Sequence, residues 1–147
     1  MEPAERIVRH FQEELDQLKA RLLEMGGLAE EQVRLATKSF VERDDALIER
    51  SLAGDALINA LHIEIDSRAF TLLALFQPMA AALRTIGSAV KINTDLERVG
   101  DLAVNIAEVA RRYAVHPLAT HTVDISGMAT LAQSMLRDAL DAFVRGD

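Results

Sequence analysis

The sequence predicts an all-α protein, an antiparallel three-helix bundle followed by a fourth helix. Apolar residues recur every three or four positions along most of the 147 residues, which is the period of an amphipathic helix. The interruptions are few, and they fall at residues 44–45, 77–78 and 114–123, where two acidic residues or a proline are found. Half of the residues are hydrophobic, which is enough to fill the core of one domain.

The first helix is predicted over residues 5–43. Its apolar stripe includes Ile7, Phe11, Leu15, Leu18, Leu22 and Met25, and continues to Phe40. Only Gly26-Gly27 interrupts it, and each glycine costs about 1 kcal/mol against alanine in a helix interior. The pair therefore indicates a kink or the close approach of another backbone, and a break between two shorter helices is the alternative.

The remaining helices follow from caps and breaks. A helix over residues 46–76 can be capped by Asp44 or Asp45. Pro78 suits the first turn of a third helix, which runs over residues 79–113. Residues 114–123 form a loop, after which Asp124 or Ser126 caps a helix that is still apolar-periodic near residue 144.

The fourth helix repeats part of the first. Residues 25–44 align without gaps on residues 128–147, with eight identities in twenty positions, including Phe-Val and the terminal Asp. We interpret this as an internal repeat. The predicted organisation is a first three-helix repeat at 1–114, a loop at 115–123, and at 124–147 the first helix of a truncated second repeat.

Composition excludes several function classes. A net charge of −7 argues against nucleic-acid binding, which requires clustered Lys and Arg. The absence of cysteine excludes disulfides and thiolate metal sites. No signal peptide is found, and the longest apolar stretch, residues 69–83, is shorter than the ~20 residues of a membrane helix. We expect a soluble, cytoplasmic protein without direct membrane insertion.

Two polar pairs mirror each other about Pro78. Asp55 and Asn59 precede it by 23 and 19 residues, and Glu97 and Asp101 follow it by 19 and 23. If the chain reverses there, the pairs face each other across a helix hairpin. Like charges four residues apart destabilise a helix by roughly 0.2–0.5 kcal/mol, so such a cluster requires a cation or open water.

The two polar stripes extend beyond these pairs, to Asp66 on one helix and Asn105 on the other. Carboxylate and amide oxygens suit cations such as Fe, Mn, Mg or Ca, and suit a structural Zn site less well. Folding the first helix back about residues 44–45 predicts further oxygens from Glu30 and Glu31. The alternatives are a solvated acidic face and, for His62, an ordinary surface or hydrogen-bonded histidine.

Several motifs, in order along the chain, resemble those of PhoU-type phosphate-uptake regulators. The main motif is Leu-Glu-Arg-Val-Gly-Asp at 96–101 followed by Asn105-Ile106, and the others include Gly-Asp-Ala-Leu-Ile-Asn at 54–59 and Gln77-Pro78. The resemblance covers residues 11–147. One departure is Ala82, where many relatives have Asp before Leu-Arg, and the second repeat's copies of both motifs are missing.

The resemblance implies two three-helix repeats and Glu/Asp-x-x-x-Asp motifs that bind clusters of metal ions. Glu97 and Asp101 match the motif, Asp55 and Asn59 are the facing pair, and Asp66 and Asn105 are neighbours. The implied cofactors are metal ions, multinuclear Fe, Zn, Mn or Mg. The implied role is a cytoplasmic regulator that links the ATPase of a phosphate ABC transporter to a sensor histidine kinase and restrains phosphate-starvation genes.

Two other classes are compared with this role. A carboxylate-bridged di-iron enzyme needs Glu-x-x-His on two helices, and none of the four histidines has Glu three residues before it. We therefore expect no enzyme. A metal-free scaffolding bundle remains the main alternative. The fourth helix, whose apolar side lacks its own unit, is expected to form a homodimer or, alternatively, to fold back on its own bundle.

Overall fold

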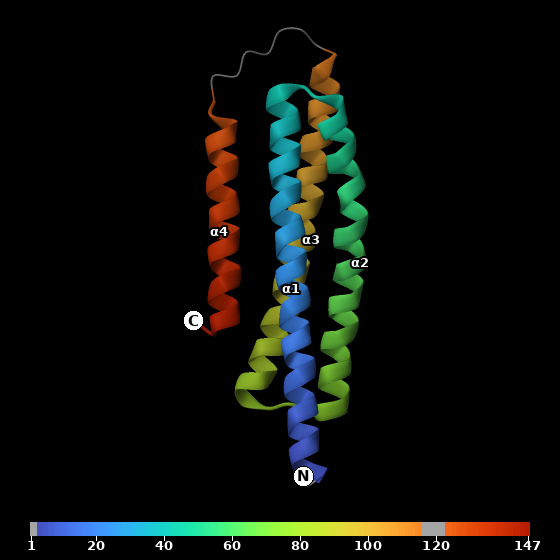
Figure 1. The fold of residues 1–147 in the computed structure, drawn as a ribbon, viewed down its shortest axis with the longest axis vertical. Coiled ribbons are helices and arrows are strands. Elements are labelled where there is room, and N and C mark those ends of the chain that lie inside the picture. Colours follow the sequence, from blue (N-terminus) through green and yellow to red (C-terminus); the bar gives the residue numbers. More distant parts are fainter. Residues whose placement is uncertain (1–2, 116–122) are drawn as a thin grey trace.

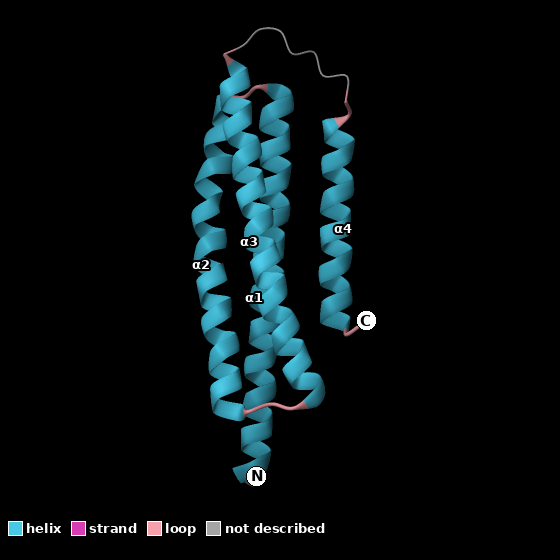
Figure 2. Cartoon of the chain, turned by 180° about the vertical axis from the view of Figure 1, so that it is seen from behind, coloured by secondary structure: helices cyan, strands magenta, loops and turns pink. Residues whose placement is uncertain are grey.

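The computed structural model describes residues 3–115 and 123–147, and its four elements are all helices (Figure 1). They are α1 (Pro3–Glu42), α2 (Asp45–Phe76), α3 (Ala80–Ala114) and α4 (Ile125–Arg145). Helices α1, α2 and α3 contact one another in an antiparallel bundle, and α4 lies alongside α1 (Figures 1 and 2). The predicted all-α class and its helix order are confirmed. Residues 116–122, most of the predicted loop, lie outside the described residues.

The caps explain where the helices begin and end. The Asp44 carboxylate accepts hydrogen bonds from the backbone N–H of Ala46 and Leu47, at 2.8 and 3.1 Å, and thereby caps α2. Asp124 caps α4 in the same way through the N–H of Gly127, at 2.9 Å. Both caps are among the residues that the sequence offers for this role.

The placement of Pro78 in the first turn of the third helix is wrong. Gln77 takes a left-handed conformation, with φ of 45°, and its N–H bonds to the carbonyl of Leu73, so α2 ends there. Proline is common directly after such a cap because it cannot continue the helix. Met79 is extended, and α3 begins only at Ala80.

The core lies along the centre of the three-helix bundle. Each helix contributes fully buried apolar side chains: Leu18, Leu22 and Met25 from α1, Ile58 and Ile65 from α2, and Ile86 and Leu96 from α3. Burying one such side chain is worth about 1.5–3 kcal/mol. The last turn of α2 also contributes to this core, since Leu72 is buried and Leu73 and Phe76 pack against the cluster.

Helix α1 runs unbroken through Gly26-Gly27, so the alternative of two shorter helices is wrong. A Cβ at Gly26 would lie 2.2 Å from Cδ1 of Leu140 on α4, whereas one at Gly27 would meet nothing within 4 Å. Gly26 therefore lets α4 approach α1 closely. The predicted close approach of another backbone is thus observed only as the approach of a side chain from the neighbouring helix, and only at the first of the two glycines.

The contact between α1 and α4 follows the internal repeat. The repeat relates Gly26 to Ala129 and Thr37 to Leu140, so the contact of Gly26 with Leu140 has a counterpart in Thr37 and Ala129. These two residues line one cavity of about 220 Å³ between the helices. The ion pair of Glu30 with Arg137 has its counterpart in Arg34 and Gln133, which line the same cavity. The repeated helices are thus arranged about an approximate two-fold axis.

Helix α4 divides its apolar residues between α1 and solvent. Leu140 is buried, and Leu136 and Phe143 pack against the core of the bundle. Three others point away and are 62–71% exposed: Met128, Leu131 and Met135. The chain therefore shows the fold-back arrangement of this helix, and the homodimer stays a prediction.

Candidate functional site

The site predicted from the mirrored pairs lies along the contact between α2 and α3. Gly100 on α3 is opposite Ile58 on α2, where a Cβ would lie 3.0 Å from the Ile58 Cδ1. Reflection about Pro78 pairs Ile58 with residue 98, so the observed register differs from the predicted one by two residues. The two polar pairs accordingly lie at similar heights along the hairpin, since each residue adds about 1.5 Å.

The pair on α2 is connected by a hydrogen bond. The amide of Asn59 donates to Oδ2 of Asp55 at 2.8 Å. The other oxygen, Asp55 Oδ1, is buried and has no hydrogen-bond partner. A buried carboxylate oxygen without a donor is costly, so this atom calls for a cation or a water molecule.

Asn93, which was not among the predicted residues, lies in the contact between α2 and α3 and bonds to Asp66. It is fully buried, and its amide donates to the carbonyl of His62 and to Oδ1 of Asp66, both at 2.9 Å. Its own Oδ1 and the Nδ1 of His62 are buried without a partner. The signal was present, because Asn93 is a polar residue in the buried stripe of α3 that includes Ile86, Ala89, Leu96 and Gly100.

The α3 residues of the motif turn progressively away from α2. At about 100° per residue, Glu97 lies about 60° from the direction of Gly100, Asp101 about 100° and Asn105 about 140°. Glu97 is half-buried, and Asp101 and Asn105 are exposed. Asn105 lines an apolar groove between α1, α3 and α4, of about 510 Å³, so it is not grouped with Asp55.

Glu30 and Glu31, the predicted sources of further oxygens, both have arginine partners. Glu30 forms an ion pair with Arg137 of α4. Glu31 accepts two hydrogen bonds from Arg34 on its own helix, which lowers the pKa of Glu31 below its usual value. A contribution of these oxygens to a metal site stays a prediction.

A metal site requires that several ligand side chains lie close to one position. Among residues 3–115 and 123–147, no three His, Cys, Asp or Glu side chains lie close enough together to hold a metal ion. The donor types fit a hard cation, and Asp55 Oδ1 lacks a partner. The carboxylates of Glu97 and Asp101 would have to turn toward it. The metal site therefore stays a prediction.

None of the four helices that the structure describes combines the length and the apolar character that a membrane-spanning helix requires.

Comparisons with known proteins agree on one family. Residues 22–110 match the model of the PhoU domain. The chain is 40% identical over 144 residues to the phosphate-specific transport system accessory protein PhoU homolog of Caulobacter vibrioides, covering 97% of this chain and 63% of the relative. It is 35% identical to the homolog of Aquifex aeolicus, covering 91% of this chain and 61% of that one.

Comparison of the fold with solved structures indicates the same family. The crystal structure of PhoU from Pseudomonas aeruginosa matches with a TM-score of 0.88 and 36% identity, covering 93% of this chain and 66% of that one. The chain thus spans less than two thirds of the length of the curated relatives named above. With the domain match, the sequence identity and the shared fold, the chain belongs to the PhoU domain family.

Proposed function

We propose that the chain acts as an accessory protein of a phosphate-specific transport system, as the names of its relatives say of them. In this role it works in the cytoplasm and is not an enzyme. It conveys phosphate sufficiency between the ATPase of a phosphate ABC transporter and a sensor histidine kinase, and it restrains phosphate-starvation genes. The family membership supports this role, together with long helical faces that leave surface for partners.

The acidic face between α2 and α3 is the proposed metal-binding part of this function. The main support for this proposal is Asp55 Oδ1, a buried oxygen that accepts no hydrogen bond from the protein. Asn59 holds the other oxygen of the same carboxylate. Glu97 and Asp101 supply further oxygens when their side chains turn toward α2, and Asp66 completes the α2 side. When bound, a metal ion would neutralise this row of carboxylates.

Metal analysis of the purified chain tests this proposal. Protein prepared without chelator is expected to contain Fe, Zn, Mn or Mg, and Asp55→Ala and Asp101→Ala are each expected to lower the metal content at least about tenfold. Asp95→Ala is the matched control. Asp95 is on α3 too, but it lines a cavity with Leu136 and Leu140 on the α4 side. Equal metal content in all variants would contradict the site.

The second candidate is a scaffolding bundle without metal. It is favoured by the side chains of the described residues, which do not converge on a metal position. A reporter of phosphate-starvation genes measures whether the chain regulates these genes, independently of whether it binds metal. Cells that lack their own copy are expected to regain repression with this chain. Full repression by Asp101→Ala would favour the metal-free scaffold, and no repression by the unaltered chain would contradict the regulatory role.

A further inference from the structure

The end of the bundle where α2 turns into α3 is free of charge. From residue 69 to residue 83 the chain contains no Asp, Glu, Lys, Arg or His. The opposite end differs, because α1 turns into α2 through four consecutive charged residues at positions 42–45. Figures 1 and 2 show the two turns at the two ends of the same bundle. Turns that water surrounds are normally rich in polar residues, so the uncharged turn indicates a different environment.

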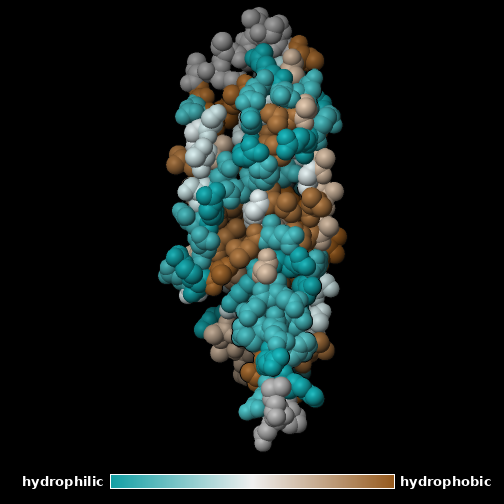
Figure 3. All heavy atoms as spheres, in the orientation of Figure 1, coloured by the Kyte–Doolittle hydropathy of each residue, from teal (hydrophilic) through white to brown (hydrophobic). Residues whose placement is uncertain are grey.

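Large apolar side chains are exposed around this uncharged turn. Five of them are 47–81% exposed, and we call them the apolar end: Ile7, Val8, Leu75, Met79 and Leu83. Ile7, Val8 and Met79 line one groove of about 250 Å³, so the first turns of α1 share this surface with the turn. Figure 3 shows hydrophobic residues at the surface near this end. Exposed apolar side chains that are grouped in this way mark an interaction site.

The exposed side chains of the apolar end have no place left in the core. Phe11 and Phe76 line the same groove, and their ring centroids are 5.2 Å apart. Both rings pack against the buried core of the bundle, as Leu73 does. The core positions at this end are therefore filled, and the apolar end is a second hydrophobic surface outside them.

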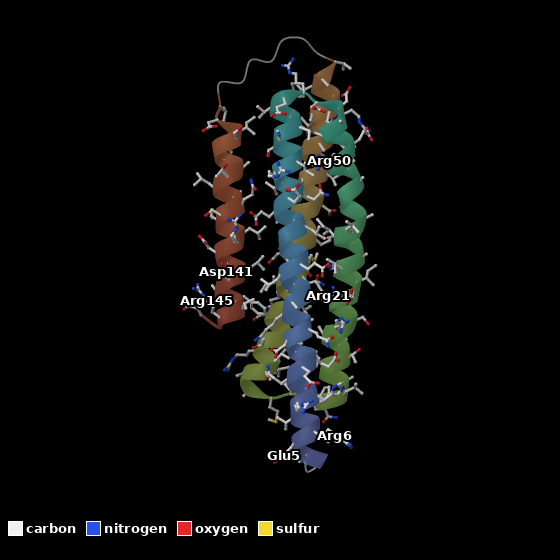
Figure 4. All side chains as sticks on the ribbon, in the orientation of Figure 1. Glu5, Arg6, Arg21, Arg50, Asp141 and Arg145 are labelled. Carbon is white, nitrogen blue, oxygen red and sulfur yellow. The ribbon has the colours of Figure 1, made fainter. Side chains whose placement is uncertain are left out.

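The acidic excess of the chain is absent from this end. Residues 3–13 and 69–84 contain three basic residues and two acidic ones, which leaves 13 of the 16 basic and 21 of the 23 acidic residues for the rest of the chain. Glu13 is paired with Arg9 at 2.9 Å. Figure 4 places Arg6 at the beginning of α1, and Arg84 directly follows the uncharged stretch. An anionic surface therefore repels most of this molecule but not the apolar end.

We propose that the apolar end binds the surface of a bilayer that contains anionic lipids. Ile7, Val8 and Met79 enter the boundary between headgroups and acyl chains, and Arg6 and Arg84 contact the lipid phosphates. Such binding grows with the apolar area that is buried and with the number of basic residues near the anionic headgroups. The contact is shallow, so it requires no membrane-spanning helix.

The shape of this end favours a bilayer over a protein partner. Figure 1 shows α1 continuing past the turn between α2 and α3, so the end of the bundle is convex. A specific protein–protein interface buries about 800 Å² on each partner, and a partner would need a matching hollow to cover that area here. A fluid bilayer adapts to a convex end without one. A second copy of the chain would bring the same arginines together, which is unfavourable.

Binding to vesicles of stated composition tests the proposal. The unaltered chain is expected to float with vesicles of phosphatidylglycerol and phosphatidylcholine in equal parts, and to float much less with phosphatidylcholine alone. Met79→Glu is expected to lower the partition coefficient about tenfold, since a charge replaces a side chain that enters the bilayer. The double variant Arg6→Gln and Arg84→Gln is expected to lower it about tenfold on the anionic vesicles only.

Leu131→Glu is the matched control, because Leu131 on α4 is 67% exposed and gains the same charge. It is expected to bind vesicles like the unaltered chain. Met79 is extended and precedes the first residue of α3, so a carboxylate there lies at a helix N-terminus and does not disturb the fold. Circular dichroism verifies this. Failure of the unaltered chain to bind, equal binding by Met79→Glu, or a loss of binding in Leu131→Glu alone would each overturn the proposal.

A dye on introduced cysteines measures which end meets the bilayer. The chain has no cysteine of its own, so the label is confined to one position. An environment-sensitive dye at Met79→Cys is expected to shift its emission to shorter wavelength when the anionic vesicles are added. The same dye at Asp45→Cys, in the opposite turn, is expected to stay unchanged. Equal shifts at both positions, or no shift at Met79→Cys, would contradict the proposed contact.

Discussion

At the scale of single residues, two neighbouring glycines have opposite surroundings. Gly26 faces Leu140 of α4 so closely that a Cβ there would lie 2.2 Å from its Cδ1, whereas Gly27 faces open space. Both have the same helical conformation within α1, so their difference is one of contact and not of backbone freedom. One glycine is needed for α4 to dock, and the other only weakens α1.

Substitution of the two glycines is expected to separate these effects. Gly27→Ala is expected to raise the free energy of unfolding by about 0.5–1 kcal/mol, since alanine is the better helix former. Gly26→Leu is expected to displace α4, because its larger side chain occupies the place of Leu140. Hydrogen exchange of the α4 amides measures docking, and a chemical melt measures stability. Faster exchange in both variants, or in neither, would contradict the assignment.

Asn93 and Asp55 show how buried polar atoms mark the site at this scale. Asn93 connects α3 to the backbone and to Asp66 of α2, and Asp55 is connected to Asn59. Each keeps one oxygen buried without a partner. With Nδ1 of His62, three buried polar atoms without a partner lie in this helix contact. This is unusual, since buried polar groups are nearly always hydrogen-bonded.

At the scale of helices, α1 and α2 are joined by ion pairs as well as by the core. Glu64 accepts from Arg68 on its own helix and pairs with Arg21 on α1. The hydrogen bond from Arg68, followed by the charge of Arg21, holds the pKa of Glu64 below its ordinary value of 4.5. A lowered pKa means that the ionised form is the one that stabilises the fold.

The pH dependence of stability follows from the direction in which the pKa of Glu64 is shifted. The contribution of Glu64 is complete above pH 4.5, the ordinary value, and is lost as the pH falls through the lower value of the folded state. Glu64→Gln is therefore expected to lower the melting temperature slightly at neutral pH and to have no effect in strong acid. Glu108→Gln, at an exposed position on α3, is the control. A constant deficit of Glu64→Gln at all pH values would contradict this account.

At the scale of the whole molecule, α1 and α4 contact each other through positions that the internal repeat relates. The repeat therefore accounts for the reciprocal contacts between the two helices. The side of α4 that corresponds to the buried side of α1 includes Met128 and Met135, which are exposed. On α1, the matching positions are Met25 and Gln32, and both are buried, Met25 in the core of the bundle and Gln32 beside Gly54 of α2. The approximate two-fold axis therefore relates α1, whose inner side is buried in the bundle, to α4, whose corresponding side is exposed.

A thermal melt distinguishes a metal-binding protein from a metal-free bundle at the same scale. If metal binds only the folded chain, a hundredfold excess over the dissociation constant adds about 2.7 kcal/mol to its stability. Chelator is then expected to lower the melting temperature of the unaltered chain, but not that of Asp101→Ala. If no metal binds, Asp101→Ala is expected to be more stable, because a like-charge pair with Glu97 is removed. Equal melting with and without chelator would count against the site.

The sequence by itself determined the helices and nearly all of their ends. Apolar periodicity depends on neighbours along the chain, and the caps at Asp44 and Asp124 are local hydrogen bonds, so both can be predicted without a fold. The hairpin register was predicted to within two residues, because one reversal near Pro78 fixes it. The repeat at residues 25–44 and 128–147 indicated the shared role of α1 and α4. The one error at a helix start came from Gln77, whose left-handed conformation no sequence rule required.

Only the tertiary structure decided which side chains meet. Glu30 and Glu31 were predicted beside the acidic pairs, yet arginines bind both, one of them from α4, more than a hundred residues away. Asn93 bonds to Asp66 in the contact between α2 and α3, and Asn105 lines the apolar groove. The physical reason is that a helix's own sequence fixes its faces, but the rotation of each helix about its axis is set by how all of the side chains pack together.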